Sequence, residues 1–145
     1  MNDEIKRAII LENYQNPKNR GLIGDNSYKK ISTNSKSCID QVDIEMKIED
    51  GIIKDIKFDG EACAICTSST SIMTTTLIKK SLDDAVRIVD NFENMIEEKE
   101  YDEDLIGEGS VYSDIAKQPN RKNCATLSWR GAKELINRSR GNKNE

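Results

Sequence analysis

Four cysteines are the side chains best suited to chemistry in this sequence, which contains no histidine. Cys63 and Cys66 are separated by two residues, in a stretch where a predicted strand gives way to a predicted helix. A helix N-terminus stabilises a thiolate, so this position suits a reactive or metal-bound sulfur. The same stretch also fits two small buried apolar residues, because cysteine outside disulfides is among the most buried residue types.

Three of the cysteines lie where predicted elements begin. Cys38 precedes a strand, with Asp40 two residues later, and Cys63 and Cys124 lie at predicted helix starts. Three thiolates and one carboxylate could hold a tetrahedral zinc ion, and the same soft ligands could hold iron and sulfide in a cluster. The ligands are too far apart in sequence for a local zinc knuckle, so spacing alone leaves both interpretations open.

The composition narrows the class of protein. The chain has 145 residues, enough for one ordinary domain, and a net charge of −4 from 22 basic and 26 acidic residues. An acidic chain argues against a nucleic-acid surface, and no stretch approaches the ~20 apolar residues of a membrane span. The first residues lack the apolar segment of a signal peptide. We therefore expect a cytoplasmic protein whose cysteines are metal ligands or catalytic thiols and not disulfides.

Hydrophobic periodicity predicts an α+β fold, a small, mainly antiparallel three-stranded sheet with helices packed on it. Apolar residues alternate from Val42 to Ile48, which is typical of a half-buried strand. Asp50-Gly51 predicts a two-residue hairpin turn, after which a strand returns through Phe58. Residues 31–37 fit an edge strand or a loop.

Helical spacing of apolar residues predicts helices at 3–16, 82–99 and 121–137, besides the Ser/Thr-rich run that follows Cys63. Residues 111–116 fit a short helical turn, and Ser81 fits an N-cap. The acidic residues 97–108 fit a solvated connection. We expect one domain at 1–138, followed by a flexible polar tail at 139–145.

Five segments in one order resemble a known family. Residues 14–21, 38–40, 58–65, 68–74 and 119–129 match motifs of the NifU N-terminal/IscU-like superfamily of iron–sulfur cluster assembly proteins. Cys38-Ile39-Asp40, for example, corresponds to the family's Cys-Gly-Asp. The matches cover most of the chain, and their common order makes the resemblance specific.

The resemblance is to the SufU type more than to the IscU type. IscU-type proteins carry a histidine directly before the last cysteine and a Leu-Pro-Pro-Val-Lys segment that a chaperone reads. Here Asn123 precedes Cys124, and the sequence contains no Pro-Pro-Val-Lys. The acidic segment 100–117 is similar to the insertion that lengthens SufU-type chains.

The resemblance implies a zinc ion held by Cys38, Asp40, Cys63 and Cys124, or alternatively iron or an iron–sulfur cluster. It implies a SufS-type cysteine desulfurase as partner, with downstream iron–sulfur assembly proteins. In that family a histidine of the desulfurase replaces one zinc ligand, and the released thiolate, matching Cys38 here, accepts persulfide sulfur. Such a sulfurtransferase stimulates its desulfurase, whereas the alternative function is a scaffold for cluster assembly. Arg121 could support thiolate charge near Cys124, or be an ordinary surface arginine.

Three positions at the expected site depart from the family pattern. Ile39 and Ala62 replace glycines, and a β-branched residue at 39 should stiffen the loop around the acceptor. Cys66 stands where the family usually has serine. Cys66 could be a further zinc ligand, a partner for a Cys63–Cys66 disulfide, or a buried substitute for the hydroxyl, and we favour the last because the family's site is complete without it.

Overall fold

The computed structural model describes residues 1–35 and 39–142. Its elements in chain order are α1 (Asp3–Gln15), β1 (Lys29–Asn34), β2 (Gln41–Glu49), β3 (Ile52–Glu61), α2 (Ala64–Leu77), α3 (Leu82–Ile96), α4 (Glu103–Ile106), the 3-10 segment η1 (Gly107–Lys117) and α5 (Pro119–Asn142). The strands form one antiparallel sheet in the order β1-β2-β3. The predicted α+β class with a three-stranded antiparallel sheet is confirmed.

The β2–β3 hairpin follows from its sequence. Asp50 and Gly51 both have positive φ, 55° and 74°, as the predicted two-residue turn requires. Val42, Ile44 and Met46 point to the core and are at most 2% exposed. The pairing with β3 shifts between Lys47 and Ile48, and the last apolar residue of the series, Ile48, is only half-buried.

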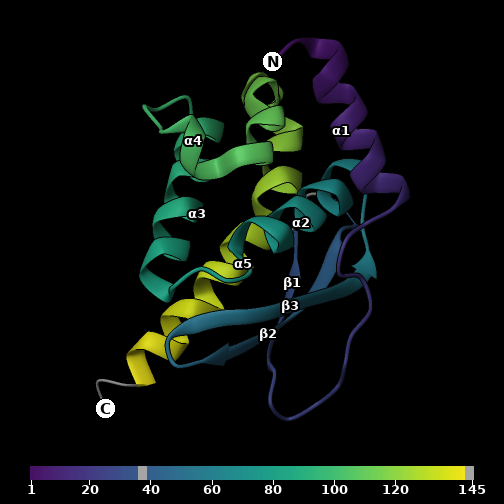
Figure 1. The fold of residues 1–145 in the computed structure, drawn as a ribbon. Coiled ribbons are helices and arrows are strands. Elements are labelled where there is room, and N and C mark those ends of the chain that lie inside the picture. Colours follow the sequence, from purple (N-terminus) through teal and green to yellow (C-terminus); the bar gives the residue numbers. More distant parts are fainter. Residues whose placement is uncertain (36–38, 143–145) are drawn as a thin grey trace.

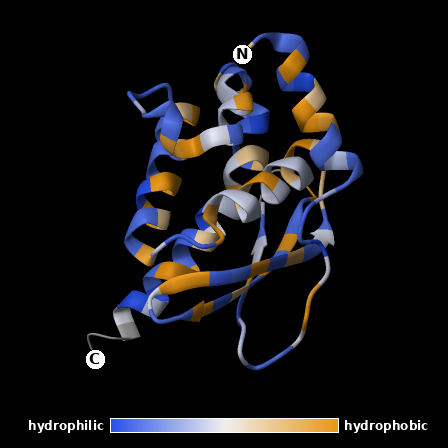
Figure 2. Ribbon diagram, viewed as in Figure 1, coloured by the Kyte–Doolittle hydropathy of each residue, from blue (hydrophilic) through white to orange (hydrophobic). Residues whose placement is uncertain are grey.

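The helices form layers on one side of the sheet (Figure 1). Helices α2 and α5 contact the strands. Helix α3 packs on α5, and η1 packs on both α2 and α5. The hydrophobic core contains apolar residues of both the strands and the helices. Figure 2 shows where the hydrophobic residues lie along these elements. Phe92 of α3 stacks on Trp129 of α5 with ring centroids 4.0 Å apart, and Tyr112 of η1 meets Phe92 edge-on.

Helix α2 lies at the centre of these layers, and its buried hydroxyl groups bond to the surrounding elements. Ser68 Oγ and the Tyr112 hydroxyl of η1 are 2.5 Å apart. Ser69 Oγ accepts from Trp129 Nε1 at 2.9 Å and donates to the Ala125 carbonyl at 2.6 Å, both on α5. The small hydroxylated residues thus permit close packing and also satisfy hydrogen bonds across it.

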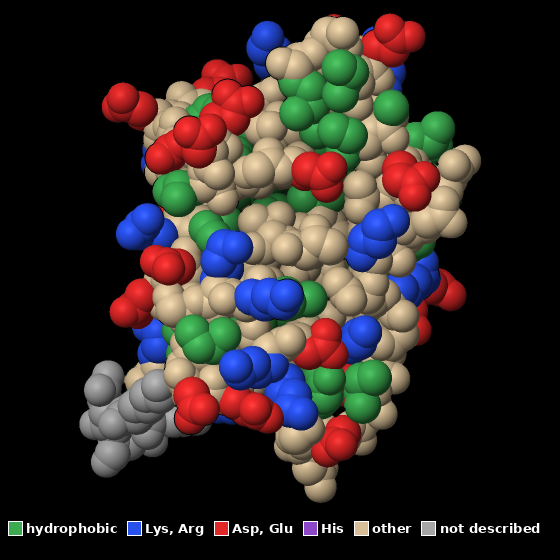
Figure 3. All heavy atoms as spheres, in the orientation of Figure 1, with side chains coloured by type: hydrophobic (Ala, Val, Ile, Leu, Met, Phe, Trp, Pro, Cys, Tyr) green, Lys and Arg blue, Asp and Glu red, His purple; other side chains and the backbone are tan. Residues whose placement is uncertain are grey.

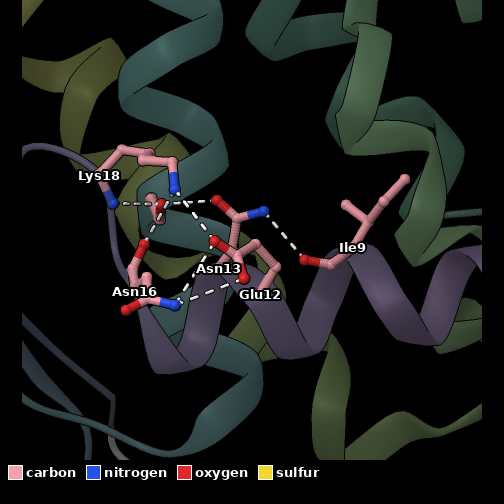
Figure 4. Close-up of polar contacts among 6 residues, drawn as sticks. Ile9, Glu12, Asn13, Asn16 and Lys18 are labelled. Carbon is pink, nitrogen blue, oxygen red and sulfur yellow. Dashed lines mark hydrogen bonds and ion pairs between the residues drawn. The ribbon is translucent and has the colours of Figure 1, made fainter.

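Helix α1 is attached to α2 through a buried asparagine (Figure 4). The Asn13 amide donates to the Ile9 carbonyl at 2.9 Å, and Asn13 Oδ1 accepts from Ser71 Oγ at 2.7 Å. The Lys18 backbone N–H donates to the same Ser71 hydroxyl at 2.8 Å. The chain on both sides of Pro17, which ends the predicted helix, is therefore fixed to one residue of α2.

Two predicted segments differ from the structure. Residues 97–108 are not only a solvated connection, because they include α4, whose Ile106 is fully buried. Acidic side chains do gather on the surface over this region (Figure 3). Helix α5 begins at Pro119, a residue well suited to a first helical turn, and continues to Asn142, so it is longer than the predicted 121–137. Ser139 within the expected tail is only 5% exposed.

None of the helices in the described ranges is both long and apolar enough to cross a membrane.

Gly131 allows α5 to pack closely on the sheet, which generates a stability prediction. A Cβ at this position would lie 2.6 Å from Thr33 Cγ2 and 3.1 Å from Ile44 Cδ1. We expect Gly131→Ala to lower the free energy of unfolding by about 1–3 kcal/mol, because overpacking outweighs the higher helix propensity of alanine. Urea denaturation followed by circular dichroism measures this change.

The matched control is Gly141→Ala in the same helix, where a Cβ would have no atom within 4 Å. This substitution should leave the stability unchanged or raise it by up to about 1 kcal/mol. Equal effects of the two substitutions would contradict the packing argument.

Candidate metal centre

Cys63 is the N-cap of α2, so its sulfur lies at the start of that helix. Its backbone is extended, with φ −66° and ψ 169°, and its Sγ accepts from the Cys66 backbone N–H at 3.4 Å. Strand β3 ends at Glu61, so only one residue separates the strand from this cap. The positive end of the α2 dipole therefore faces a sulfur atom that the sheet and the helix both hold in place.

Asp40 lies directly before β2 and is 1% exposed. Its Oδ1 accepts from the Cys63 backbone N–H at 2.7 Å, and its Oδ2 is 3.6 Å from Cys63 Sγ. Its carbonyl accepts from the Ser35 N–H at 3.1 Å, on the other side of residues 36–38. The carboxylate thus joins the start of β2 to the start of α2.

Cys124 comes from a third element, α5. It is 6% exposed, and its Sγ is 3.9 Å from the Asn120 carbonyl one turn earlier. The sequence predicts Cys124 at the start of a helix. Because α5 begins at Pro119, Cys124 lies instead in the second turn of that helix. Arg121 is exposed in the first turn.

The three side chains meet. Ligand atoms of Asp40, Cys63 and Cys124 all lie within 4.8 Å of one another. Around a tetrahedral zinc ion with Zn–S bonds of about 2.3 Å, neighbouring sulfurs are about 3.8 Å apart, so the three atoms need to approach by no more than about 1 Å. A buried carboxylate beside two sulfurs is also a donor set that a divalent cation stabilises. The residues present therefore fit zinc.

The remaining residues of the expected site fall into two groups. Cys38 lies outside the described residues. Ile39, which follows it, is 92% exposed, an unusual position for a large apolar side chain. Cys66 is fully buried, and its sulfur is not part of the group formed by Asp40, Cys63 and Cys124.

Tyr112 was not identified from the sequence as a neighbour of this site. Its phenol is buried against Ser68, one turn along α2 from Cys63, and burial raises its pKa, so the hydroxyl stays protonated. Its hydrogen bond with Ser68 connects η1 to the first turns of α2. No motif signals this role, because Tyr112 and Ser68 are brought together only by the packing of distant segments.

Comparison with known proteins identifies the family. The profile described as "NifU-like N terminal domain" matches residues 5–125. The chain belongs to the NifU-like N-terminal domain family, whose members act in iron–sulfur cluster assembly.

Two curated relatives represent the two types within this family. The zinc-dependent sulfurtransferase SufU of Bacillus subtilis is 32% identical over 140 residues, covering 96% of this NifU-like chain and 94% of that protein. The iron–sulfur cluster assembly scaffold protein IscU of Streptococcus pyogenes is 32% identical over 133 residues, covering 91% of this chain and 82% of that one.

Solved structures agree with the NifU-like fold. A protein from Fervidobacterium islandicum, described as a candidate iron–sulfur cluster assembly scaffold for the SUF system, has a TM-score of 0.79 at 26% identity and covers 88% of this chain and 93% of that one. A NifU-like protein from Brucella abortus has a TM-score of 0.83 at 22% identity, covering 93% and 94% of the two chains. The latter likeness concerns the fold alone.

Asp40 has two separable roles in this geometry, hydrogen-bond acceptor and ligand, and two substitutions distinguish them. In metal-free protein, Asp40→Ala should lower the free energy of unfolding by about 1–3 kcal/mol, because the Cys63 N–H loses its acceptor. Asp40→Asn keeps an acceptor oxygen and removes a buried charge, so its metal-free stability should stay close to that of the wild type.

Chemical denaturation in the presence of a chelator measures both stabilities. Metal titration of the same proteins should then show weaker zinc retention in both variants, since both lack the carboxylate. An Asp40→Asn protein that binds zinc as tightly as the wild type would show that the carboxylate is not a ligand.

Proposed function

We propose that this protein is a zinc-dependent sulfurtransferase that accepts persulfide sulfur from a SufS-type cysteine desulfurase and stimulates it. The observation that carries the proposal is the proximity of the ligand atoms of Asp40, Cys63 and Cys124, one carboxylate and two thiols suited to zinc, in a chain without histidine. The similarity to SufU of Bacillus subtilis over nearly the whole chain supports it. Its place of action in this proposal is the cytoplasm.

In the proposed site Cys38 completes the ligand set and is the sulfur acceptor. Asp40 belongs to the group and follows Cys38 by two residues, a separation that an extended chain spans with about 7 Å. When bound, zinc would keep the coordinating sulfurs deprotonated without redox chemistry of its own. Cys63 is held by its cap on α2 and Cys124 lies within α5, so in this proposal these two sulfurs stay in place when Cys38 is released.

The transfer step itself is an exchange between sulfurs. The Cys38 thiolate attacks the terminal sulfur of the desulfurase persulfide, a new S–S bond forms, and the S–S bond on the desulfurase breaks. The bonding electron pair stays on the desulfurase cysteine, which leaves as thiolate, and Cys38 carries the persulfide. Arg121, exposed in the first turn of α5, would support negative charge on the sulfurs near Cys124.

A scaffold function is the second candidate, because IscU-named relatives match the chain about as well in percentage identity. In that case the same ligands would hold an iron–sulfur cluster. The absence of a histidine before Cys124, where Asn123 stands, favours the sulfurtransferase.

Metal content separates these two candidates. Protein purified without air should be colourless and contain one zinc per chain, and chelation should lower its melting temperature. A ligand at 100 times its Kd adds about 2.7 kcal/mol, which for a chain of this size is roughly 5–10 °C. A brown protein containing iron and sulfide would instead support the scaffold, and an unchanged melting temperature after verified zinc loss would rule out a zinc-stabilised fold.

The position of the transferred sulfur tests the acceptor. After incubation with a SufS-type desulfurase and cysteine, mass spectrometry should find persulfide mainly on the tryptic peptide 37–47, which contains Cys38. Cys63 and Cys66 share the peptide 58–79, and Cys124 is in 123–130, so the assignment is unambiguous. Cys38→Ala should abolish acceptance, whereas the control Cys66→Ser should retain it. Persulfide on the peptide 123–130 in the Cys38→Ala protein would overturn the proposed acceptor.

A further inference from the structure

Cys66 is not part of the candidate ligand group formed by Asp40, Cys63 and Cys124, but it lies in the first turn of α2, three residues after Cys63. Its backbone N–H donates to Cys63 Sγ at 3.4 Å, and its side chain is fully buried. Because the N–Cα bond is about 1.5 Å, the Cys66 Cα lies at most about 4.9 Å from that sulfur. Two cysteines placed in this way can be bridged without moving one element relative to another.

We propose that Cys63 and Cys66 form a reversible disulfide when the protein meets a hydroperoxide, and that Cys66 is the resolving thiol. Cys63 is partly exposed and can react with the oxidant, whereas the Cys66 side chain is buried. The bridge removes Cys63 from the group that it forms with Asp40 and Cys124. Its consequence for zinc rests on the proposed function, but the formation of the bridge does not.

The reaction balances with one peroxide. The Cys63 sulfur attacks one peroxide oxygen, an S–O bond forms and the O–O bond breaks. The departing hydroxide takes the Cys63 proton as one water, which leaves a sulfenic acid on Cys63. The Cys66 sulfur then attacks the Cys63 sulfur, the S–O bond breaks, and the departing hydroxyl takes the Cys66 proton as a second water. Two thiols are oxidised to one disulfide, and a dithiol reductant reverses the change.

Cys124 is the competing partner, because its sulfur also lies within 4.8 Å of Cys63 Sγ. A Cys63–Cys124 bridge would join α2 to α5, and α5 is held by the stacking of Trp129 on Phe92 and by the close fit of Gly131 on the sheet. A Cys63–Cys66 bridge lies within the first turn of α2 and therefore requires no movement of α5 relative to α2. The structure therefore favours Cys66.

Peptide mapping tests the proposal directly. Metal-free wild-type protein is treated with one equivalent of hydrogen peroxide, alkylated and digested with trypsin. A Cys63–Cys66 bridge makes peptide 58–79 resistant to alkylation and two hydrogens lighter, with no cross-link, because both cysteines are in that peptide. We expect this form to be the main product. A cross-link between peptides 58–79 and 123–130 as the main product would overturn the proposal.

Cys66→Ser provides the matched variant, with Cys66→Ala as a second if the serine protein folds poorly. Without a resolving thiol, Cys63 should proceed to sulfinic or sulfonic acid, which a dithiol does not reduce. Zinc binding, measured with a chelating dye, should return after reduction in the wild type and remain lost in the variant. Equal recovery in both proteins would refute a resolving role for Cys66.

The two readouts separate the two proposals. If the wild-type protein forms the bridge but binds no zinc when reduced, the disulfide proposal is supported and the zinc-dependent function is refuted. If the protein binds zinc but forms no bridge in its metal-free state, the disulfide proposal is refuted and the zinc-dependent function is supported.

Discussion

The burial of helix α2 is the constraint on which the rest of the structure depends. From Cys66 to Thr74 every residue of the helix is buried, and six of them carry hydroxyl groups. A buried hydroxyl without a partner is unfavourable. Some of these groups donate to carbonyls of α2 itself, as Thr70 does to Cys66, but others bond to neighbouring elements. Tyr112, Trp129 and Asn13 supply three of these contacts from η1, α5 and α1. A helix of larger apolar residues would pack, but it would not specify its neighbours in this way.

The position of the candidate metal centre follows from this central helix. Cys63 caps α2, so any displacement of the helix would move its sulfur away from Asp40 and Cys124. The Asp40–Cys63 hydrogen bond couples the same cap to the sheet. The ligand atoms converge because three separately packed elements end or begin at one place, and not because a short loop carries them.

Local signals in the sequence identified the elements well. The Asp50-Gly51 turn, the alternation in β2 and the Ser81 cap depend on neighbouring residues, and all three are present in the structure. The predicted helix at 121–137 starts too late, because proline can occupy the first turn of a helix and Pro119 is the first residue of α5. Glu45 shows a different limit. This carboxylate on an alternating strand is buried, because the backbone N–H groups of Ile23 and Gly24 bind it.

The candidate site could be predicted only in part from the residue types. The absence of histidine and the cysteines at element starts pointed to a thiolate and carboxylate site, but spacing could not bring Cys63 and Cys124 together across the intervening helices. The resemblance to a family supplied that grouping, and the described part of the chain confirms the proximity of Asp40, Cys63 and Cys124. The partners of Ser68 and Ser69 depend on tertiary packing, which no local pattern encodes.

The segment η1 has a consequence for the order in which this chain folds. It contains an eleven-residue run of 3-10 turns, a conformation that rarely exceeds three or four residues because its hydrogen bonds are poorly aligned. Val111, Tyr112 and Ile115 are buried against helices distant in sequence, so the segment gains its stability from surfaces that must already exist. We infer that η1 orders after α2 and α5 have docked, and that in hydrogen exchange it opens before them.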